Sequence, residues 1–324
     1  MGTLRRIGTR ESQLAVWQAT KVQQLLLENN LHSELVYIKS EGDIDLQTPL
    51  YEMGVTGIFT RSLDLALLNN RIDIAVHSMK DVPTQLPTGI VQAAVLKRAS
   101  YKDLLVYKNA ALTHVECALV NEDSNTFESF FSTPQMPFTI ATSSIRRKAQ
   151  WLNRFPNHQI ENLRGNVNTR LQKVKDSHWH GAIFAAAGVE RIGLRPGNSI
   201  DLDWMLPAPA QGAIVVLCRQ NDESSMNACA QFNDTDTAAC TKVERDFLRT
   251  LLGGCSTPIS ALAEVKESNI IFKGNILSVD GKEKAVIEKW HPMNAVTDLG
   301  KIFAEELLNN GGQKIADGIR NAKQ

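Results

Sequence analysis

Residues 4–26, L-R-R-I-G-T-R-E-S-Q-L-A-V-W-Q-A-T-K-V-Q-Q-L-L, predict a short strand that passes directly into a helix. The strand is expected over residues 4–8 and the helix from about Glu11 onward. Apolar residues recur at i, i+4, i+7 and i+11, so they share one face of an α-helix. These residues are Ala15, Ala19, Val22 and Leu26.

The same alternation of strand and helix continues along the chain. L-V-Y-I at 35–38 and I-A-V-H at 74–77 are predicted strands, and a helix is expected between them over about 60–70. A further strand-to-helix unit lies at 138–152, F-T-I-A-T-S-S-I-R-R-K-A-Q-W-L, with an expected apolar face of Ile145, Ala149 and Leu152. This alternation implies βαβ units and a mainly parallel sheet with helices on both faces.

These patterns predict an α/β fold class with two similar α/β domains and a small α+β C-terminal domain. The expected domains are 1–98 with 213–231, then 102–206, and finally 232–324. Proline-rich M-L-P-A-P-A-Q-G-A at 205–213 is expected to connect domains, and the irregular segment 108–138 to be a surface excursion. In the third domain we expect a helix, a hairpin with a D-G turn, and a last helix over about 296–309.

Composition limits the possible functions. The chain has 324 residues, 43% of them apolar, and Lys+Arg and Asp+Glu number 35 each. This balanced charge argues against a general nucleic-acid binder. We see neither a signal peptide nor an apolar run long enough to span a membrane, so a cytoplasmic protein is expected.

The five cysteines suggest neither a disulfide framework nor a zinc clip, because their number is odd and no C-x-x-C occurs. Four of them are expected to be small buried or neutral residues. These are Cys117, Cys218, Cys229 and Cys240. The remaining one, Cys255, stands out in L-L-G-G-C-S-T-P, with no histidine nearby to act as a base.

Positive charge meets predicted helix starts at three places. In A-T-S-S-I-R-R-K, Arg146 and Arg147 lie in a first helical turn, where the helix dipole favours acids. G-T-R-E-S, with Arg10, repeats the arrangement, and N-L-R-G-N-V-N-T-R-L carries Arg164 and Arg170. Free N–H groups, hydroxyls and guanidinium groups together bind anions. The alternative is that these are capped helices whose arginines are solvated.

Ligands of α/β sheets bind at the carboxyl ends of the strands, so these arginines predict a pocket for a ligand with several negative groups. Phosphates and carboxylates both remain possible on this evidence. Asp81, in D-I-A-V-H-S-M-K-D-V-P, follows another strand and is expected to stay ionised among the cations. It would then accept N–H bonds or stabilise a developing cation. The alternative is a turn paired with Lys80.

Two histidine motifs invite other interpretations. We expect His77 to be a strand-end hydrogen-bonding residue rather than a catalytic base. S-H-W-H at 177–180 suggests a metal site, but it has no third ligand at a recognisable spacing. We therefore expect a solvated turn there and no metal.

Six motifs in this order resemble the porphobilinogen deaminase, or hydroxymethylbilane synthase, family over nearly the whole chain. They are T-R-E-S-Q-L-A, D-I-A-V-H-S-M-K-D-V-P, A-T-S-S-I-R-R, L-R-G-N-V-N-T-R, A-P-A-Q-G-A and L-L-G-G-C-S-T-P-I. The resemblance implies two α/β domains similar to periplasmic binding proteins and a third domain that carries Cys255. It also implies a monomer with a dipyrromethane cofactor held by Cys255 through a thioether.

The activity implied by this resemblance is head-to-tail condensation of four porphobilinogen molecules with release of ammonia. Water then releases the linear tetrapyrrole. Asp81 matches the family's catalytic carboxylate. Basic positions of the family match Arg10, Arg146, Arg147, Arg164, Arg170 and Arg191. Its hydroxyl and loop positions match Ser12, Ser78, Thr142, Ser143 and Ser144. Further binding positions match Phe59, Arg61, Lys80, Asn166, Gln211 and Gly212.

The chain departs from the family pattern in M-G-V-T-G-I-F, where Thr56 stands in place of a usual lysine. Slower elongation or altered affinity for intermediates is expected. Two other functions would also fit an arginine-lined cleft or a reactive cysteine. One is a two-lobed ligand-binding protein without chemistry, and the other is a transferase or hydrolase with a cysteine nucleophile.

Overall fold

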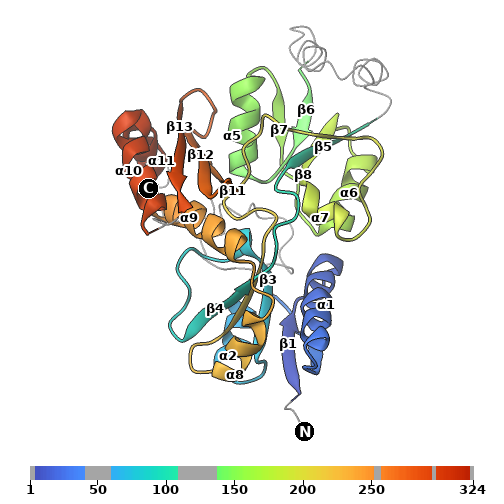
Figure 1. The fold of residues 1–324 in the computed structure, drawn as a ribbon. Helices are drawn as coiled ribbons and strands as arrows, with labels where there is room; N and C mark the ends of the chain where they lie inside the picture. Colours follow the sequence, from blue (N-terminus) through green and yellow to red (C-terminus); the bar gives the residue numbers. More distant parts are fainter. Residues whose placement is uncertain (1–3, 41–59, 109–136, 252–256, 294–296, 322–324) are drawn as a thin grey trace.

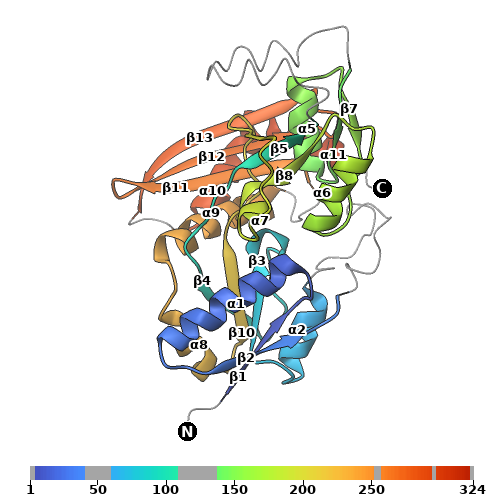
Figure 2. The same cartoon turned by 90° about the vertical axis from the view of Figure 1, so that its right-hand side faces the viewer.

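The computed structural model describes residues 4–40, 60–108, 137–251, 257–293 and 297–321. Three sheets organise these residues, and each sheet has its own helices (Figure 1). Figures 1 and 2 show the N-terminal sheet at the bottom, with the other two sheets above it. The predicted α/β class with a C-terminal α+β part is therefore confirmed.

Sheet A has the strand order β2-β1-β3-β10-β4. Its strands are β1 (Arg5–Thr9), β2 (Ser33–Tyr37), β3 (Ile74–Ser78), β4 (Ile90–Val95) and β10 (Ile214–Arg219). Its helices are α1 (Gln13–Glu28), α2 (Arg61–Leu68) and α8 (Glu223–Ala230). Alternate residues of β3 and β10 face α2 on one side and α1 with α8 on the other, which gives two separate buried clusters.

Sheet B has the order β7-β6-β8-β5-β9. Its strands are β5 (Asp103–Tyr107), β6 (Thr139–Ala141), β7 (Gln159–Glu161), β8 (Gly181–Ala185) and β9 (Ser199–Asp201). Its helices are α5 (Ile145–Arg154), α6 (Val167–Asp176) and α7 (Ala186–Glu190). Trp151 of α5 packs on one face, while Val174 of α6 and Val189 of α7 pack on the other.

The expectation of a mainly parallel sheet is confirmed for four of the five strands in sheet A and in sheet B, and one strand in each runs the other way. In sheet A, β1, β2 and β3 are parallel, whereas β10 is antiparallel to both β3 and β4. In sheet B, β5 is likewise antiparallel to β8 and β9. β5 and β10 run opposite to their neighbours because of the chain path. Each directly follows a segment that crosses from one sheet to the other, so each enters its sheet from the end that faces the other sheet.

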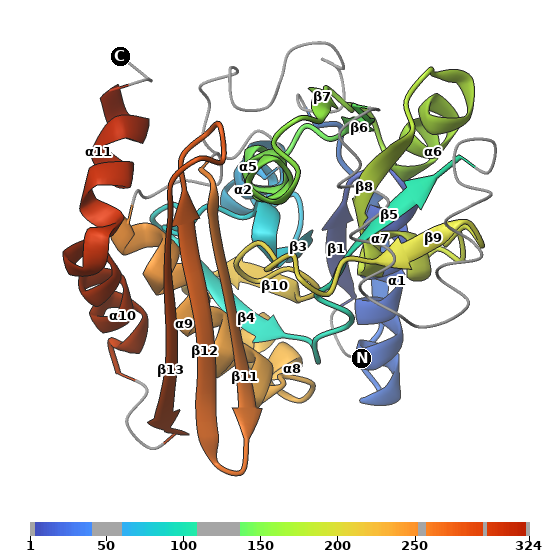
Figure 3. The same ribbon diagram turned by 90° about the horizontal axis from the view of Figure 1, so that it is seen from above.

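Sheet C is an antiparallel meander of β11 (Ile259–Lys266), β12 (Asn269–Leu277) and β13 (Lys284–Pro292). The expected D-G turn joins β12 to β13, with Gly281 at φ 77°. One face of the sheet is covered by three helices (Figure 3). They are α9 (Thr235–Leu251), α10 (Leu299–Leu307) and α11 (Gln313–Asn321), and η4 (Leu308–Gly312) joins the last two.

Three of the cysteines expected to be inert are buried. Cys218 and Cys229 are fully buried and Cys240 is 5% exposed. Burial raises the pKa of the Cys218 thiol to about 11, and that of each of the other two to about 12. These thiols stay protonated and unreactive at neutral pH. Cys117 lies outside the described residues.

The segment 177–180 is not the solvated turn we expected. His180 accepts a hydrogen bond from the Thr139 backbone N–H at Nδ1, 2.9 Å away. Trp179 packs against the α6–α7 side of sheet B. None of the helices in the described part of the chain is long and apolar enough to cross a membrane.

Candidate active site between the first two domains

Lys80 and Asp81 lie in a single 3₁₀ turn, η2 (Met79–Asp81), which follows β3 directly. Both side chains are partly buried. The ammonium group of Lys80 lies 3.2 Å from Oε1 of Gln211, a residue of the segment that connects sheet B back to sheet A. The predicted carboxylate and its neighbouring lysine therefore lie where the first two domains meet.

Arg146 and Arg147 begin α5, where Ser144 accepts the Arg147 backbone N–H as N-cap. The sequence pattern is compatible both with solvated arginines and with arginines in a pocket. Arg146 and Arg147 are not solvated, because they are only 4% and 6% exposed. The expected apolar face is only partly right: Ala149 is fully buried, but Ile145 and Leu152 are half-buried, and the buried side of the helix includes both arginines.

The buried arginines are compensated by Asp103, a fully buried carboxylate at the start of β5. Its Oδ1 accepts from Nε and Nη2 of Arg147 at 3.0 and 2.7 Å, and its Oδ2 lies 2.7 Å from Nη1 of Arg146. Burial alone would raise the pKa of Asp103, but the two guanidinium groups outweigh it and hold the pKa far below its usual range. Sequence reasoning missed Asp103, although a lone acid before L-L-V-Y was a possible signal.

The third arginine motif forms the start of α6. Asn166 caps this helix by accepting the Thr169 N–H, and the Asn166 side chain is exposed. Arg164 is 3% exposed, whereas Arg170 is partly buried and donates to the Gly165 carbonyl at 2.7 Å. Burial, with smaller effects of Arg147, Arg164 and Arg10, lowers the pKa of Arg170 to about 10, although the charge of Asp81 opposes this. Arg170 and Asp81 therefore interact across the domain boundary.

The N-terminal motif contributes Arg10, which is partly buried beyond β1, and Ser12, which caps α1 by accepting the Ala15 N–H. His77, at the end of β3, is 5% exposed, and its Nε2 has no hydrogen-bond partner among the described residues. Burial, with a smaller effect of Arg10, lowers the pKa of His77 to about 3. The imidazole is therefore neutral at neutral pH and adds no charge to the site.

Arg191 links the two domains at a different point. Its Nη2 donates to the Gly212 carbonyl at 2.6 Å, and its guanidinium lies 5.8 Å from the centre of the Trp17 ring of α1. The Gly212 backbone has φ 87°, which glycine adopts without strain. Arg191 and Gly212, which were both predicted to belong to one binding site, therefore lie together. Arg191 contacts the backbone carbonyl of Gly212 in the connecting segment.

The predicted hydroxyl positions serve local structure in different ways. Ser78 accepts from Nε2 of Gln18 at 2.8 Å, and Ser143 donates to the Leu163 carbonyl at 2.7 Å. The hydroxyl oxygen of Thr142 accepts the Ser144 N–H at 3.2 Å. These bonds position the chain at the carboxyl ends of β3 and β6.

Some of the predicted site residues do not lie with the residues described above, or lie outside the described part of the chain. Arg61 is exposed at the start of α2. Thr56, Phe59 and Cys255 lie outside the described residues. Their predicted roles therefore stay predictions.

We call Arg10, Lys80, Arg146, Arg147, Arg164 and Arg170 the cationic cluster. Electrostatic interactions connect its members to one another and to the carboxylates of Asp81 and Asp103. Six cationic side chains thus face two carboxylates, so a ligand with several negative groups would stabilise the arrangement. A dipyrromethane with acetate and propionate side chains fits this donor set, because guanidinium groups form charge-assisted hydrogen bonds with carboxylates.

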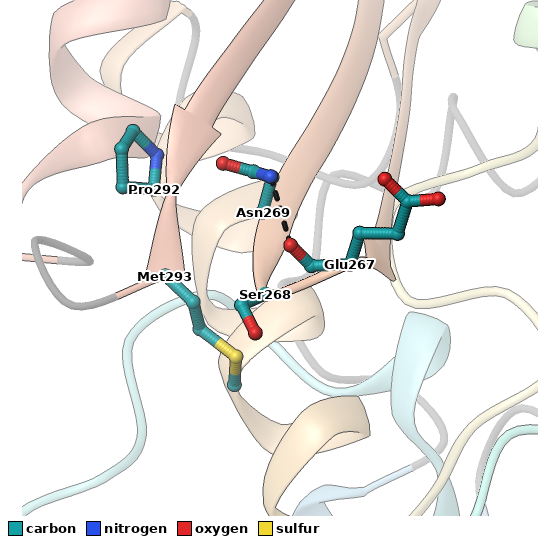
Figure 4. Close-up of a pocket in the computed structure, with 5 residues that line it drawn as sticks. All are labelled: Glu267, Ser268, Asn269, Pro292 and Met293. Atoms are coloured by element: carbon teal, nitrogen blue, oxygen red, sulfur yellow. Dashed lines mark hydrogen bonds between the residues drawn. The ribbon is translucent and has the colours of Figure 1, made fainter.

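A pocket of about 540 Å³ lies elsewhere, at the β11–β12 turn and the end of β13 (Figure 4). It is lined by Glu267, Ser268, Asn269, Pro292 and Met293. The Asn269 amide donates to the Glu267 carbonyl within the turn, at 2.9 Å. This pocket holds no member of the cationic cluster, and charge rather than volume therefore identifies the candidate site.

The sequence matches two family models. Residues 5–227 match "Porphobilinogen deaminase, dipyromethane cofactor binding domain", and residues 238–309 match "Porphobilinogen deaminase, C-terminal domain". Among solved structures, an ancestral cationic amino acid solute binding protein is 14% identical, with a TM-score of 0.43 over 71% of this chain and 88% of that one.

Curated relatives share the name of the family models. Porphobilinogen deaminase from Desulforamulus reducens is 37% identical and covers 97% of both chains. The protein from Syntrophotalea carbinolica is 39% identical over 96% of this chain and 94% of its own. The chloroplastic protein of Oryza sativa is 36% identical over 98% of this chain and 87% of its own. Similarity over the whole length, together with a site suited to a polyanion, shows that this chain belongs to the porphobilinogen deaminase family.

Proposed function

We propose that this protein is a hydroxymethylbilane synthase, a transferase of tetrapyrrole biosynthesis. It condenses four porphobilinogen molecules head to tail with release of ammonia, and water then releases the linear tetrapyrrole. The observation that carries the proposal is the cationic cluster around Asp81. Each pyrrole unit brings two carboxylates, so a growing chain needs an excess of positive charge of this kind.

The cluster binds and orients the carboxylates of substrate and product. Arg147 and Arg170 are close enough to influence each other, and Asp81 is close to Arg170 and Lys80. An acid placed among cations remains an acceptor rather than a proton donor. Asp81 accepts pyrrole N–H bonds and stabilises the positive charge that develops when ammonia leaves porphobilinogen.

We further propose that Cys255 holds the dipyrromethane through a thioether. When bound, this group supplies the pyrrole carbon to which the first substrate is joined. The lysine and arginines of the cationic cluster, with Arg191, would bind its carboxylates. The predicted binding roles of Ser12, Ser78, Thr142, Ser143, Ser144, Asn166, Gln211 and Gly212 belong to the same proposal, as do those of Phe59 and Arg61.

Three expectations about domain boundaries, oligomeric state and cellular location accompany this proposal. The domain boundaries 1–98 with 213–231, 102–206 and 232–324 are supported by the separation of the three sheets. The monomeric state and the cytoplasmic location follow from the family resemblance and from the free thiols. Size-exclusion chromatography with light scattering tests the monomeric state, and localisation of the tagged protein tests the cytoplasmic location.

Intact-mass spectrometry tests the function directly. The purified protein should be heavier than its sequence by one dipyrromethane, and brief exposure to porphobilinogen should add a ladder of single pyrrole units. Cys255→Ser protein should show neither. A mass equal to that of the sequence, with porphobilinogen bound but unchanged, would instead favour the two-lobed binding protein. An active enzyme with a free Cys255 thiol would favour the cysteine-nucleophile alternative.

A further inference from the structure

Asp103 connects several members of the candidate site, although its carboxylate is fully buried. It anchors Arg146 and Arg147, as described above. Its Oδ1 also accepts from Nε2 of Gln211, 2.9 Å away. A single carboxylate at the start of β5 therefore contacts α5 and the segment that connects the two domains.

The orientation of the Gln211 amide follows from its partners. Nε2 lies 2.7 Å from the Tyr101 carbonyl and 2.9 Å from Asp103, and both of these groups are acceptors only. The NH₂ group must face them, so Oε1 is left to face the Lys80 ammonium, 3.2 Å away. Asp103 thus acts on Lys80 through Gln211, because its negative charge favours the amide orientation that Lys80 needs.

Charged groups on α5, η2 and β5 affect the protonation of Lys80. Burial and the charges of Arg147 and Arg146 of α5 together lower the pKa of Lys80 to about 8, while Asp81 of η2 and Asp103 of β5 oppose this shift. Among the charged groups of the described residues that act on Lys80, loss of Asp103 would leave two buried guanidinium groups opposed by Asp81. The uncharged amine would then be favoured.

We propose that Asp103 is a positioning residue, which holds the Lys80 ammonium in place through Gln211 and fixes the Arg147 guanidinium beside it. The proposal rests on the function proposed above, since it concerns the same site. It assigns Asp103 no contact with substrate. Its effect is to keep a cation next to Asp81 in spite of burial and of the surrounding positive charge.

The first test measures Lys80 rather than turnover. Competitive acetylation with acetic anhydride from pH 6 to pH 10, followed by peptide mass spectrometry, gives the midpoint at which Lys80 becomes reactive. In Asp103→Asn protein this midpoint should fall by about one pH unit, as expected for loss of a charge at close range in a protein interior. Asp203→Asn is the matched control, because it removes an exposed acid that pairs with Lys102 instead. The control should leave the midpoint unchanged.

An unchanged Lys80 midpoint in folded Asp103→Asn protein would overturn the proposal. If that variant does not fold, Gln211→Met supplies the test, because it removes the link to Lys80 and leaves the Asp103 charge. Its Lys80 midpoint should also fall, and an unchanged midpoint would likewise contradict the proposal.

The second test uses the pH dependence of tetrapyrrole formation by the holoenzyme. In Asp103→Asn enzyme the alkaline loss of activity should move to lower pH by the same amount as the Lys80 midpoint. A variant that is slower at every pH but keeps the parent profile would show a merely structural role. If the protein forms no tetrapyrrole but the acetylation midpoint still shifts, the proposed function fails and the role of Asp103 stands.

Discussion

The carboxylate of Glu244 forms a two-pronged ion pair with the guanidinium of Arg98, with oxygen–nitrogen distances of 2.5 and 3.1 Å. Glu244 is fully buried in α9, and it also accepts the backbone N–H groups of Ala210 and Ala263 at 2.6 and 2.7 Å. One carboxylate thus joins the segment after β4, the connecting segment before β10, and sheet C. It links the C-terminal domain to the other two.

Glu244→Gln should therefore reduce the free energy of unfolding strongly. The substitution leaves the Arg98 charge buried without its partner, which typically costs about 3–5 kcal/mol. Lys242→Ala, two residues earlier in α9, removes the exposed partner of an ion pair with Asp246 and should cost less than about 1 kcal/mol. Urea unfolding at pH 7 measures both. Equal losses in the two variants would show that Glu244 does not hold the domains together.

Gly212→Ala should be more destabilising than Gly193→Ala. Both glycines have positive φ, 87° and 67°, so each alanine carries a backbone cost of about 1–2 kcal/mol. At Gly212 the added Cβ would also lie 2.7 Å from the carbonyl oxygens of Ala99 and Ser100, whereas at Gly193 no atom of the described residues beyond the chain neighbours lies within 4 Å of it. The clash should add about 1–3 kcal/mol. Similar midpoints of thermal unfolding for the two variants would contradict this prediction.

Asp81→Asn should lower the rate of tetrapyrrole formation by about 10²-fold or more, the usual effect of losing one group that stabilises developing charge. The fold should be preserved, because the side chain is only partly buried. Asp176→Asn is a suitable control, since its exposed carboxylate accepts from the neutral amide of Gln172. Single-turnover rates with porphobilinogen measure the effect. Parent-like rates for Asp81→Asn would remove Asp81 from the mechanism.

Acid should weaken the N-terminal domain through Asp73. Burial alone would raise the pKa of this carboxyl, but hydrogen bonds from Arg6 and Arg219 outweigh it and lower the pKa to about 2. Because the folded value lies below the unfolded one, the ionised carboxylate contributes stability above about pH 4. That contribution, about 2 kcal/mol, is lost as the pH falls toward 2.

Urea unfolding between pH 7 and pH 2.5 checks this prediction. Asp73→Asn should be less stable than the parent at pH 7, and the difference should shrink as the pH falls. Asp176→Asn serves as the control for replacing an exposed aspartate. A gap for Asp73→Asn that stays the same at every pH would show that Arg6 and Arg219 do not stabilise the ionised form.

Thr56→Lys should restore the basic side chain that the family usually has at this position. We expect faster elongation or tighter binding of the intermediates, because one more cation would face a polyanionic chain. Native mass spectrometry of the enzyme–intermediate complexes gives their distribution at a fixed substrate ratio. If turnover and distribution match the parent, Thr56 does not account for any difference in elongation.

The sequence by itself determined most local structure and the family. Helical periodicity placed α1, the strand–helix alternation placed α2, and the N-caps Ser12, Ser144 and Asn166 stand directly before their helices. These features depend on neighbours within a few residues, which a sequence shows directly. The motif order carried the family assignment for the same reason, because each motif is continuous in the chain.

Only the tertiary structure decided which charges are buried and what compensates them. The local sequence does not distinguish Arg146 and Arg147 from surface arginines, yet both are buried. Their burial is possible because Asp103 of β5, more than forty positions earlier in the chain, pairs with both of them. The antiparallel entry of β5 and β10, and the Gln211 link between Lys80 and Asp103, likewise depend on segments far apart in the chain. Burial and pairing arise from such contacts, and local sequence patterns do not encode them.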